Sequence, residues 1–595
     1  MTETVAEILD AYRTGAIAPA DIVARNYARI RAHDDPAIFI TLREESAVLA
    51  EAEALARDGD NSLPLYGIPV AVKDNIDVKG LPTTAACPAF AYRPHQDATA
   101  VARVRAAGAL ILGKTNLDQF ATGLVGTRTP YGIGRNLFDD RLIPGGSSTG
   151  SALAVAAGFT PLALGTDTAG SGRVPAGFAN IVGLKPSCGM VSTAGLVPAC
   201  RTLDCVSVFA LTVDDAMTML GVIAGADPAD PYSRARALPA VAAMPRGVRL
   251  GVPLPGERLF FGDKISAAAY DDALARLAEL GAKIVEIDIE PFYAAARLLY
   301  EGPWVAERFL TAKDLIASSP ESLHPVTRQI ILAGAHGTAA DAFAAFYQLE
   351  VLRRVRDHTF RSIDALVLPT APTIYTVEQV LADPIHLNSR LGTYTNFVNL
   401  LDLCGLAVPA SMRGDGIPFG ITLLARAGED AALAAIGREF HAATGLPLGA
   451  LKARQPPLAK PAAAPLSGEI AVAVVGAHLS GMPLNDELRA AGGRLIGRAA
   501  TAPHYRLFAL SGTKPPKPGL LRVKNGAGAA IEVEVWALDD AAFGRFVAAV
   551  PPPLSIGTLD LDDGRPVKGF LVEADAVDGA RDISSFGGWR AFVDS

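Results

Sequence analysis

The chain has 595 residues, more than a compact domain of ~100–200 residues holds. Half of the residues are hydrophobic and 19% are charged, a composition that excludes a wholly disordered protein. Lys and Arg number 54 against 62 Asp and Glu, and the resulting net charge of −8 argues against nucleic acid or an anionic membrane as a partner.

The cysteines and the chain's first residues bear on its compartment. Five cysteines without a CxxC pair exclude a disulfide scaffold in a chain of this length. The N-terminal residues include acids and lack the apolar core of a signal peptide. No run of about 18 apolar residues is present to cross a membrane. We therefore expect a cytoplasmic protein with no membrane partner.

The first predicted elements are helices, followed by an alternation of strands and helices. Residues 3–56 are predicted to be helical because Leu9, Tyr12 and Ile22 recur near helical spacing and an Ala/Glu-rich stretch follows. The segment LYGIPVAVKDNIDV alternates apolar and other residues as a strand does. From about 97 to 250, short apolar strands alternate with Ala-rich helices, which predicts an α/β layer architecture.

The second half of the chain changes composition at one place. A helix is predicted over 267–280, then the strands KIVEIDI, DALVLPTAP and FGITLLA, and a helix through Phe440. Residues 454–468 are rich in Pro and Ala, which indicates a linker. The strand-rich residues 469–595 have the size of a domain. We therefore predict domains over 1–453 and 469–595, and on pattern alone the second suits docking or dimerisation.

Residues 143–187 are unusually rich in Gly and Ser. The turn PGGSSTG, starting at Pro144, runs directly into the apolar helix SALAVAAG, so that backbone N–H groups lie near a positive helix end. A second hydroxyl-bearing turn, TDTAGSGR, starts at Thr166 one strand later. Such turns are also ordinary connections in an α/β sheet. Because two of them on adjacent elements can face one cleft, we interpret this region as a candidate active site.

These motifs carry a resemblance to a known family. The pattern GGSSxG, LGTDTxGSxRxP and GLKPS, preceded by GIPVAVKDN, resembles the amidase signature family of serine hydrolases over roughly residues 5–445. The resemblance implies an α/β fold with a mixed central sheet covered by helices, and a Ser–cis-Ser–Lys triad. It makes Ser171 the nucleophile, Ser147, 24 residues before it, the bridging serine, and Lys73 the base. Ser148 is the alternative to Ser147.

The family resemblance also implies where an oxyanion would bind. The donors would be backbone N–H groups from Thr168, Ala169 and Gly170 through Ser171. Ala169 and Thr149 replace common glycines of the family pattern, and Gly172 replaces a common isoleucine, but no triad group is lost.

Lys73 can act as a base only when its amine is neutral. Its pKa must then fall by ~2–3 from the reference of ~10.4, and burial among Val70, Val72 and Ile76 would have that effect. Ser147 would relay the proton from Ser171, because an alcohol is a weak nucleophile until a base takes its proton. Pairing with Asp74 would instead raise the pKa, and a solvated surface lysine is the structural alternative.

Other motifs do not support a cofactor. Residues 108–115 match the P-loop pattern GxxxxGK[ST], but the intervening residues have the pattern of an apolar strand and the preceding ones that of a helix, so structural hydrogen bonds are expected for Lys114. The nine histidines are scattered, and Cys200 and Cys205 lack partner ligands. We expect no metal and no organic cofactor.

The substrate is suggested by a second resemblance. Residues 298–309, LLYEGPWVAERF, resemble allophanate hydrolases within the family. Arg308 would bind the carboxylate of allophanate bidentately and Tyr300 would hydrogen-bond it. Eight residues apart, the two would lie on nearly one face of a helix. The resemblance adds Gly123 to the pocket; a surface arginine and a half-buried core tyrosine are the alternative.

The C-terminal region supports the same assignment. Residues 469–595 resemble the allophanate hydrolase C-terminal domain and the α+β gamma-glutamyl cyclotransferase-like fold. The resemblance implies a homodimer, and a role for this domain in breaking down an N-carboxylated product, with His478 as the candidate catalytic residue. A histidine satisfied by backbone groups is the structural alternative. Two other functions stay open: an amidotransferase A-type subunit serving aminoacyl-tRNA, and an amidase-like scaffold that only binds.

Overall fold

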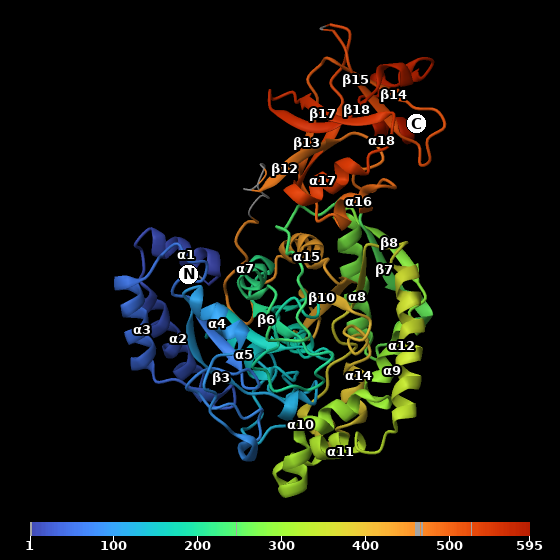
Figure 1. Ribbon diagram of the computed structural model, residues 1–595. Helices are drawn as coiled ribbons and strands as arrows, with labels where there is room; N and C mark the ends of the chain where they lie inside the picture. Colours follow the sequence, from blue (N-terminus) through green and yellow to red (C-terminus); the bar gives the residue numbers. More distant parts are fainter. Residues whose placement is uncertain (1–2, 246, 459–464, 466–467, 525) are drawn as a thin grey trace. The chain divides into compact units, whose positions relative to one another are not determined.

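The computed structural model describes the chain except residues 1–2, 246, 459–464, 466–467 and 525 (Figure 1). The chain divides into two compact units, Met1–Leu238 with Arg249–Pro457, and Pro239–Val248 with Leu458–Ser595. The short segment Pro239–Val248 thus belongs to the second unit, where Ala242 packs against the hydrophobic core. Apolar patterning does not reveal this assignment, because the segment is too short and irregular to form an element.

The first unit is built on one mixed sheet, which among the described residues has eleven strands. In sheet order the strands are β1 Phe39–Leu42, β3 Leu110–Thr115, β2 Pro69–Lys73, β4 Leu162–Thr166, β6 Val206–Ala210, β5 Val182–Lys185, β10 Leu403–Met412, β11 Pro418–Arg426, β9 Ala365–Pro369, β7 Arg249–Pro253 and β8 Lys283–Ile287. Strand β2 is parallel to β3 and β4, whereas β4 is antiparallel to β6 and β10 is antiparallel to β5 and β11.

Helices surround this sheet (Figure 1), which confirms the predicted α/β class. The first nine are α1 Val5–Arg13, α2 Pro19–His33, α3 Glu45–Asp58, α4 Thr99–Ala106, α5 Thr149–Ala156, α6 Val174–Phe178, α7 Val213–Ile223, α8 Lys264–Glu279 and α9 Glu290–Glu301. They are followed by α10 Trp304–Ser318, α11 Pro325–Ala333, α12 Ala339–Thr359, α13 Val377–Ala382, α14 His386–Leu391 and α15 Asp430–Thr444.

The prediction of continuous helix over 3–56 is wrong in one part. Strand β1 separates α2 from α3 and pairs antiparallel with the edge of β3. Its four residues, FITL, are too few to show a strand period beside two long Ala-rich helices. The tertiary pairing with β3 decides their conformation.

The centre of the sheet is buried on both faces. All residues of β2 and β4 are buried, as is the whole of α5, which packs over them. A Cβ added at Gly150 in the first turn of α5 would lie 2.2 Å from the carbonyl oxygen of Ile38, so only glycine permits this close approach. The two Gly/Ser turns predicted to face one cleft are thereby anchored to a rigid core.

The P-loop-like segment is a strand preceded by helix α4. Lys114, in β3, is fully buried, and its Nζ donates hydrogen bonds to the carbonyl of Pro82 at 3.1 Å and to Thr83 Oγ1 at 3.0 Å. It also pairs with Asp74 at 3.1 Å. These contacts confirm the structural role predicted for Lys114.

The described residues of the second unit form two smaller sheets and short helices. The five-stranded sheet has the order β13 Arg494–Ala500, β16 Glu532–Asp539, β12 Glu469–Val474, β18 Pro566–Val572 and β17 Leu554–Asp560. The three-stranded sheet is β15 Pro518–Arg522, β14 Tyr505–Ala509 and β19 Arg581–Asp582. The helices are α16 Asn485–Ala490, α17 Asp540–Ala548 and α18 Trp589–Val593. The strand-rich character predicted for 469–595 is confirmed.

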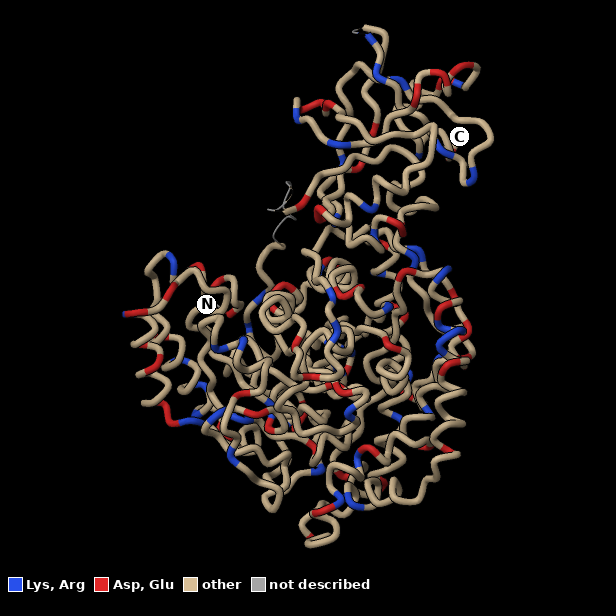
Figure 2. Tube along the Cα trace, viewed as in Figure 1, with Lys and Arg blue, Asp and Glu red and all other residues tan. Residues whose placement is uncertain are grey.

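The charged residues of both signs are spread over the chain. Figure 2 shows basic and acidic residues interspersed along both units. Within the described residues, no helix is both long and apolar enough to cross a membrane.

Candidate active site

Lys73 is the last residue of β2 and its side chain is completely buried. Its Nζ donates hydrogen bonds to Ser147 Oγ at 2.8 Å and to Thr166 Oγ1 at 2.7 Å. Thr166 ends the neighbouring strand β4, so the parallel pairing of β2 with β4 brings these two polar groups together. The alternative of a solvated surface lysine is wrong, because the strand carries Lys73 into the core.

Burial lowers the pKa of Lys73 to about 7, although the carboxylates of Asp118, Asp167 and Asp204 oppose this effect. The pKa of a buried lysine falls because the charged ammonium loses its hydration. Asp74 does not pair with Lys73, since its carboxylate contacts Lys114 and Thr84 instead. Near neutral pH, a large fraction of Lys73 is therefore an uncharged amine that can accept a proton.

The two adjacent serines of the GGSS motif have different surroundings. Ser147 Oγ accepts the hydrogen bond from Lys73, and the peptide bond between Gly146 and Ser147 is cis. Ser148 Oγ donates to the carbonyl of Thr166 at 3.1 Å and accepts from the amide of Thr166 at 3.3 Å. Ser147 therefore faces the buried amine, whereas Ser148 ties the start of α5 to the end of β4.

Ser171 lies on the loop between β4 and α6. Asp167 holds this loop, since its carboxylate accepts hydrogen bonds from the amides of Gly170 (2.8 Å) and Gly172 (3.1 Å) and pairs with Arg173 at 2.8 Å. Ser171 is 3% exposed, and its hydroxyl makes no hydrogen bond to any described residue. Its hydroxyl is thus not committed to another protein group, and the contacts of Asp167 hold the loop that carries it.

Gly170 precedes this serine with a backbone conformation that favours glycine. Its φ is +127°, and an added Cβ would lie 2.4 Å from Thr395 Oγ1. Its amide already donates to Asp167, whereas the amides of Thr168, Ala169 and Ser171 donate to no described residue. Of the predicted oxyanion donors, Gly170 is therefore engaged within the loop, and the remaining amides are free.

The structure brings Arg308 and Tyr300 together, but not on one helix. Tyr300 is near the end of α9 and Arg308 is in α10, so the expectation of a single helix is wrong. The intervening Gly302 and Pro303 break it, because proline cannot continue a helix. Arg308 Nη2 lies 3.5 Å from the Tyr300 hydroxyl, and the guanidinium lies 5.5 Å from the Tyr300 ring centre.

Arg308 is a buried cation without a carboxylate partner among the described residues. Its Nη1 donates to the carbonyl of Ala121 at 3.2 Å and to Thr122 Oγ1 at 3.0 Å, and its Nε is buried with no partner. Gly123, the third predicted binding residue, follows these two contacts directly, and an added Cβ there would lie 2.6 Å from Asp118 Oδ2. Arg308 and the segment of Gly123 thus belong to one site.

Sequence reasoning missed two polar contacts of the site, those of Thr166 and Asp204. Thr166 is the second acceptor for the Lys73 amine. Asp204 accepts a hydrogen bond from Thr168 Oγ1 at 2.5 Å. Thr166 belongs to the LGTDT motif, so pairing the strand of this motif with the strand of Lys73 would have identified Thr166 as a neighbour of the lysine. No sequence motif marks Asp204.

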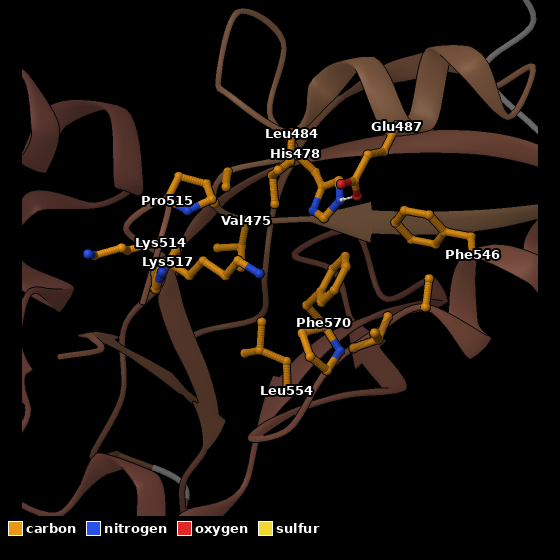
Figure 3. Close-up of a pocket in the computed structure, with 16 residues that line it drawn as sticks. Val475, His478, Leu484, Glu487, Lys514, Pro515, Lys517, Phe546, Leu554 and Phe570 are labelled. Atoms are coloured by element: carbon orange, nitrogen blue, oxygen red, sulfur yellow. Dashed lines mark hydrogen bonds and ion pairs between the residues drawn. The ribbon is translucent and has the colours of Figure 1, made fainter. Parts of the chain in front are cut away.

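His478 lies in a separate cavity of about 260 Å³ within the second unit (Figure 3). Its Nε2 is 2.9 Å from Glu487 Oε2, and its ring stacks on Phe570. Burial lowers the pKa of His478, with Glu487 opposing this effect. Figure 3 shows the side chain of Lys517 extending into the same cavity.

The described residues contain no group of three or more His, Cys, Asp or Glu side chains able to hold a metal ion. The five cysteines are buried and unbridged.

Comparison with known proteins places this geometry in a family. The amidase family model matches residues 21–434, and the model of the allophanate hydrolase C-terminal domain matches residues 470–594. The chain belongs to the amidase family. It is 44% identical to urea amidolyase of Lachancea kluyveri, over 95% of this chain and 31% of that protein. The chain thus spans about a third of the length of the first curated relatives it matches.

Two further relatives have lengths closer to that of this chain. A solved structure of Kluyveromyces lactis allophanate hydrolase is 41% identical, with a TM-score of 0.79, and covers 99% of both chains. The A-type subunit of glutamyl-tRNA(Gln) amidotransferase from Chlorobium luteolum is 34% identical over 71% of this chain and 93% of that protein. The amidase domain is common to these relatives. The C-terminal domain separates them, since the allophanate hydrolase structure covers 99% of this chain and the A-type subunit 71%.

Replacing Ser147 by Ala should slow labelling of Ser171 by a fluorophosphonate ~10²–10⁴-fold, the usual contribution of positioned proton transfer. Ser148→Ala is the matched control, because its hydroxyl contacts only the backbone of Thr166. Mass spectrometry of the labelled peptide gives the rates. Equal rates for the two variants would contradict the assignment of Ser147.

Proposed function

We propose that the chain hydrolyses the terminal amide of allophanate, with Ser171 as nucleophile, Ser147 as proton relay and Lys73 as base. The observation that carries the proposal is the completely buried Lys73 amine, hydrogen-bonded to Ser147 at 2.8 Å. Thr166, the second partner of this amine, ends the strand that leads into the Ser171 loop. The likeness to Kluyveromyces lactis allophanate hydrolase supports the same reaction.

The residues would act in two stages. Ser171 Oγ attacks the amide carbonyl carbon while its proton passes through Ser147 to Lys73, and the free amides of the loop bind the resulting oxyanion. The leaving nitrogen takes a proton returned by the same relay and departs as ammonia. Water then attacks the carbonyl carbon of the Ser171 ester, and the relay takes the water's proton and returns it to Ser171 Oγ as the ester bond breaks. This frees the dicarboxylated nitrogen compound.

Arg308 gives the substrate preference. A buried guanidinium without a carboxylate partner is unfavourable unless an anion binds to it. Nε and Nη2 have donor capacity left, since Nε has no partner and Nη2 is 3.5 Å from Tyr300. A planar carboxylate next to an amide, as in allophanate, would fill this site.

The second unit would act on the dicarboxylated product. Its cavity brings His478 and Lys517 together against the aromatic rings of Phe546 and Phe570. A cation would bind a carboxylate there, and the imidazole would transfer the proton needed at nitrogen as carbon dioxide leaves. We further propose a homodimer in the cytoplasm, following the family resemblance.

An amidotransferase A-type subunit is the competing proposal, supported by 34% identity to such a protein. That match covers 71% of this chain, whereas residues 470–594 match the allophanate hydrolase C-terminal domain. This additional domain favours allophanate as the substrate.

Purified protein should release ammonia from allophanate, and Ser171→Ala should remove that release because it lacks the hydroxyl that would form the ester. Glutamine is assayed beside allophanate. Release from glutamine alone would favour the amidotransferase proposal, and full activity of Ser171→Ala would reject the nucleophile.

Activity should fall about tenfold for each pH unit below 7. Lys73 acts as a base only when neutral, and its pKa is lowered to about 7, so acidification protonates it and removes the base. The measurement is kcat/KM for ammonia release between pH 6 and pH 9. Activity that still rises tenfold per pH unit up to pH 9, toward the ordinary lysine value of 10.5, would show that the amine is not desolvated.

Arg308→Met should raise KM for allophanate about 10- to 100-fold, because hydrogen bonds to charged groups contribute about 1.5–3 kcal/mol. Tyr300→Phe should have a smaller effect, and Arg297→Ala, whose guanidinium pairs with Glu290 on the exposed face of α9, should have none. Steady-state kinetics separate the three. An unchanged KM for Arg308→Met would contradict the proposal that Arg308 binds the carboxylate of allophanate.

His478→Ala should leave the first ammonia release unchanged and delay the appearance of carbon dioxide about tenfold, the lower end of the range for losing proton transfer. Ammonia and carbon dioxide are followed in the same sample. Glu487→Gln, which keeps a hydrogen-bond partner for the imidazole, is the control. Identical carbon dioxide time courses would indicate a structural role for the second unit.

A further inference from the structure

Asp204 is a buried carboxylate that contacts Thr168. Thr168 belongs to the loop between β4 and α6 that carries Ser171, called the nucleophile loop below. Asp204 Oδ1 accepts a hydrogen bond from Thr168 Oγ1 at 2.5 Å. Its oxygens also accept from the amides of Ala199 at 2.8 Å and Cys200 at 3.2 Å. No ion pair to Asp204 is present among the described residues. Thr168 is therefore its side-chain hydrogen-bond donor.

The nucleophile loop is consequently held by two carboxylates that act on different parts of it. Asp167 holds the part after Ala169 through the amides of Gly170 and Gly172. Asp204 holds the part before Ala169 through the hydroxyl of Thr168. The free amides of Thr168 and Ala169 lie between these two anchors, so their direction depends on both.

We propose that Asp204 is a positioning residue, which acts through the hydroxyl of Thr168 to direct the backbone amides of Thr168 and Ala169 toward the oxyanion. This inference rests on the proposed function, because the oxyanion forms only when Ser171 attacks an amide. An oxyanion hole stabilises the transition state through donors fixed in advance. The hydrogen bond from the Thr168 hydroxyl to Asp204 restrains the Thr168 side chain and, through it, the direction of the adjoining backbone amides.

The contact has the character expected of a fixed anchor. A hydroxyl donating to a carboxylate at 2.5 Å is a charge-assisted hydrogen bond, shorter than neutral ones. Burial raises the pKa of Asp204 to about 6, while the Thr168 hydroxyl and the Cys200 amide oppose this effect. The carboxylate thus stays ionised at and above neutral pH, where the neutral Lys73 also acts.

The test is the kinetics of Thr168→Val, which keeps the branched shape and removes the hydroxyl. We expect kcat for ammonia release to fall about 10- to 100-fold with KM unchanged, less than the ~10²–10³ caused by losing a whole donor. Thr168→Ser should restore most of kcat. Combining Thr168→Val with Asp204→Asn should lower kcat no further than the more damaging single variant, because both remove one contact.

Thr160→Val is the matched control for loss of a buried hydroxyl, since Thr160 Oγ1 donates to the carbonyls of Pro69 and Leu162 at the other end of β4. It should lower the thermal midpoint and leave kcat unchanged. If Thr168→Val behaves the same way, or raises only KM, the positioning role is overturned.

Fluorophosphonate labelling of Ser171 separates this inference from the proposed function. The phosphonyl oxygen binds the same amides, so Thr168→Val should label more slowly whatever the natural substrate is. If the wild type is inactive on allophanate but is labelled faster than Thr168→Val, only the proposed substrate is rejected and the positioning role stands. Equal labelling rates for wild type and Thr168→Val would reject the positioning role.

Discussion

The site depends on one constraint, the burial of the Lys73 amine without a carboxylate paired to it. Desolvation favours the neutral amine, and a direct ion pair would reverse that effect. Carboxylates are nevertheless present around the lysine, those of Asp118, Asp167 and Asp204. Burial outweighs their influence, and none of the three forms an ion pair or hydrogen bond with the Lys73 amine among the described residues.

The partners of these carboxylates show how the fold meets this constraint. The Asp118 carboxylate accepts hydrogen bonds from the amides of Val125, Gly126 and Arg128, and the Asp167 carboxylate forms an ion pair with Arg173. Asp74, the immediate neighbour in sequence, turns to Lys114 on β3. Asp74 lies in the turn after β2, where its carboxylate contacts Lys114 and Thr84, so the adjacent opposite charges of Lys73 and Asp74 do not pair. The buried hydrogen bonds of the loops thus preserve a free amine.

Sequence predicted the parts of this arrangement that have a period or a motif. The strand of Lys73, the helix after GGSS and the separate strand-rich C-terminal region follow from local pattern. The strand β1 and the break between Tyr300 and Arg308 were missed, because a four-residue strand shows no period and a spacing of eight residues does not reveal the break at Gly302 and Pro303. Asp204 could not be predicted, since its function depends on a contact 36 residues away in sequence.

The two buried basic residues Lys73 and Arg308 respond to burial in different ways, and this difference links substrate binding to proton transfer. Lysine can lose its proton, whereas arginine in a protein cannot, so Arg308 requires an anion and Lys73 does not. The charge of Arg308 is among the influences that lower the pKa of Lys73. A substrate carboxylate bound to Arg308 would cancel much of that repulsion. Lys73 would then become a stronger base when the substrate is in place, and this coupling would favour proton removal from Ser171 only in the occupied site.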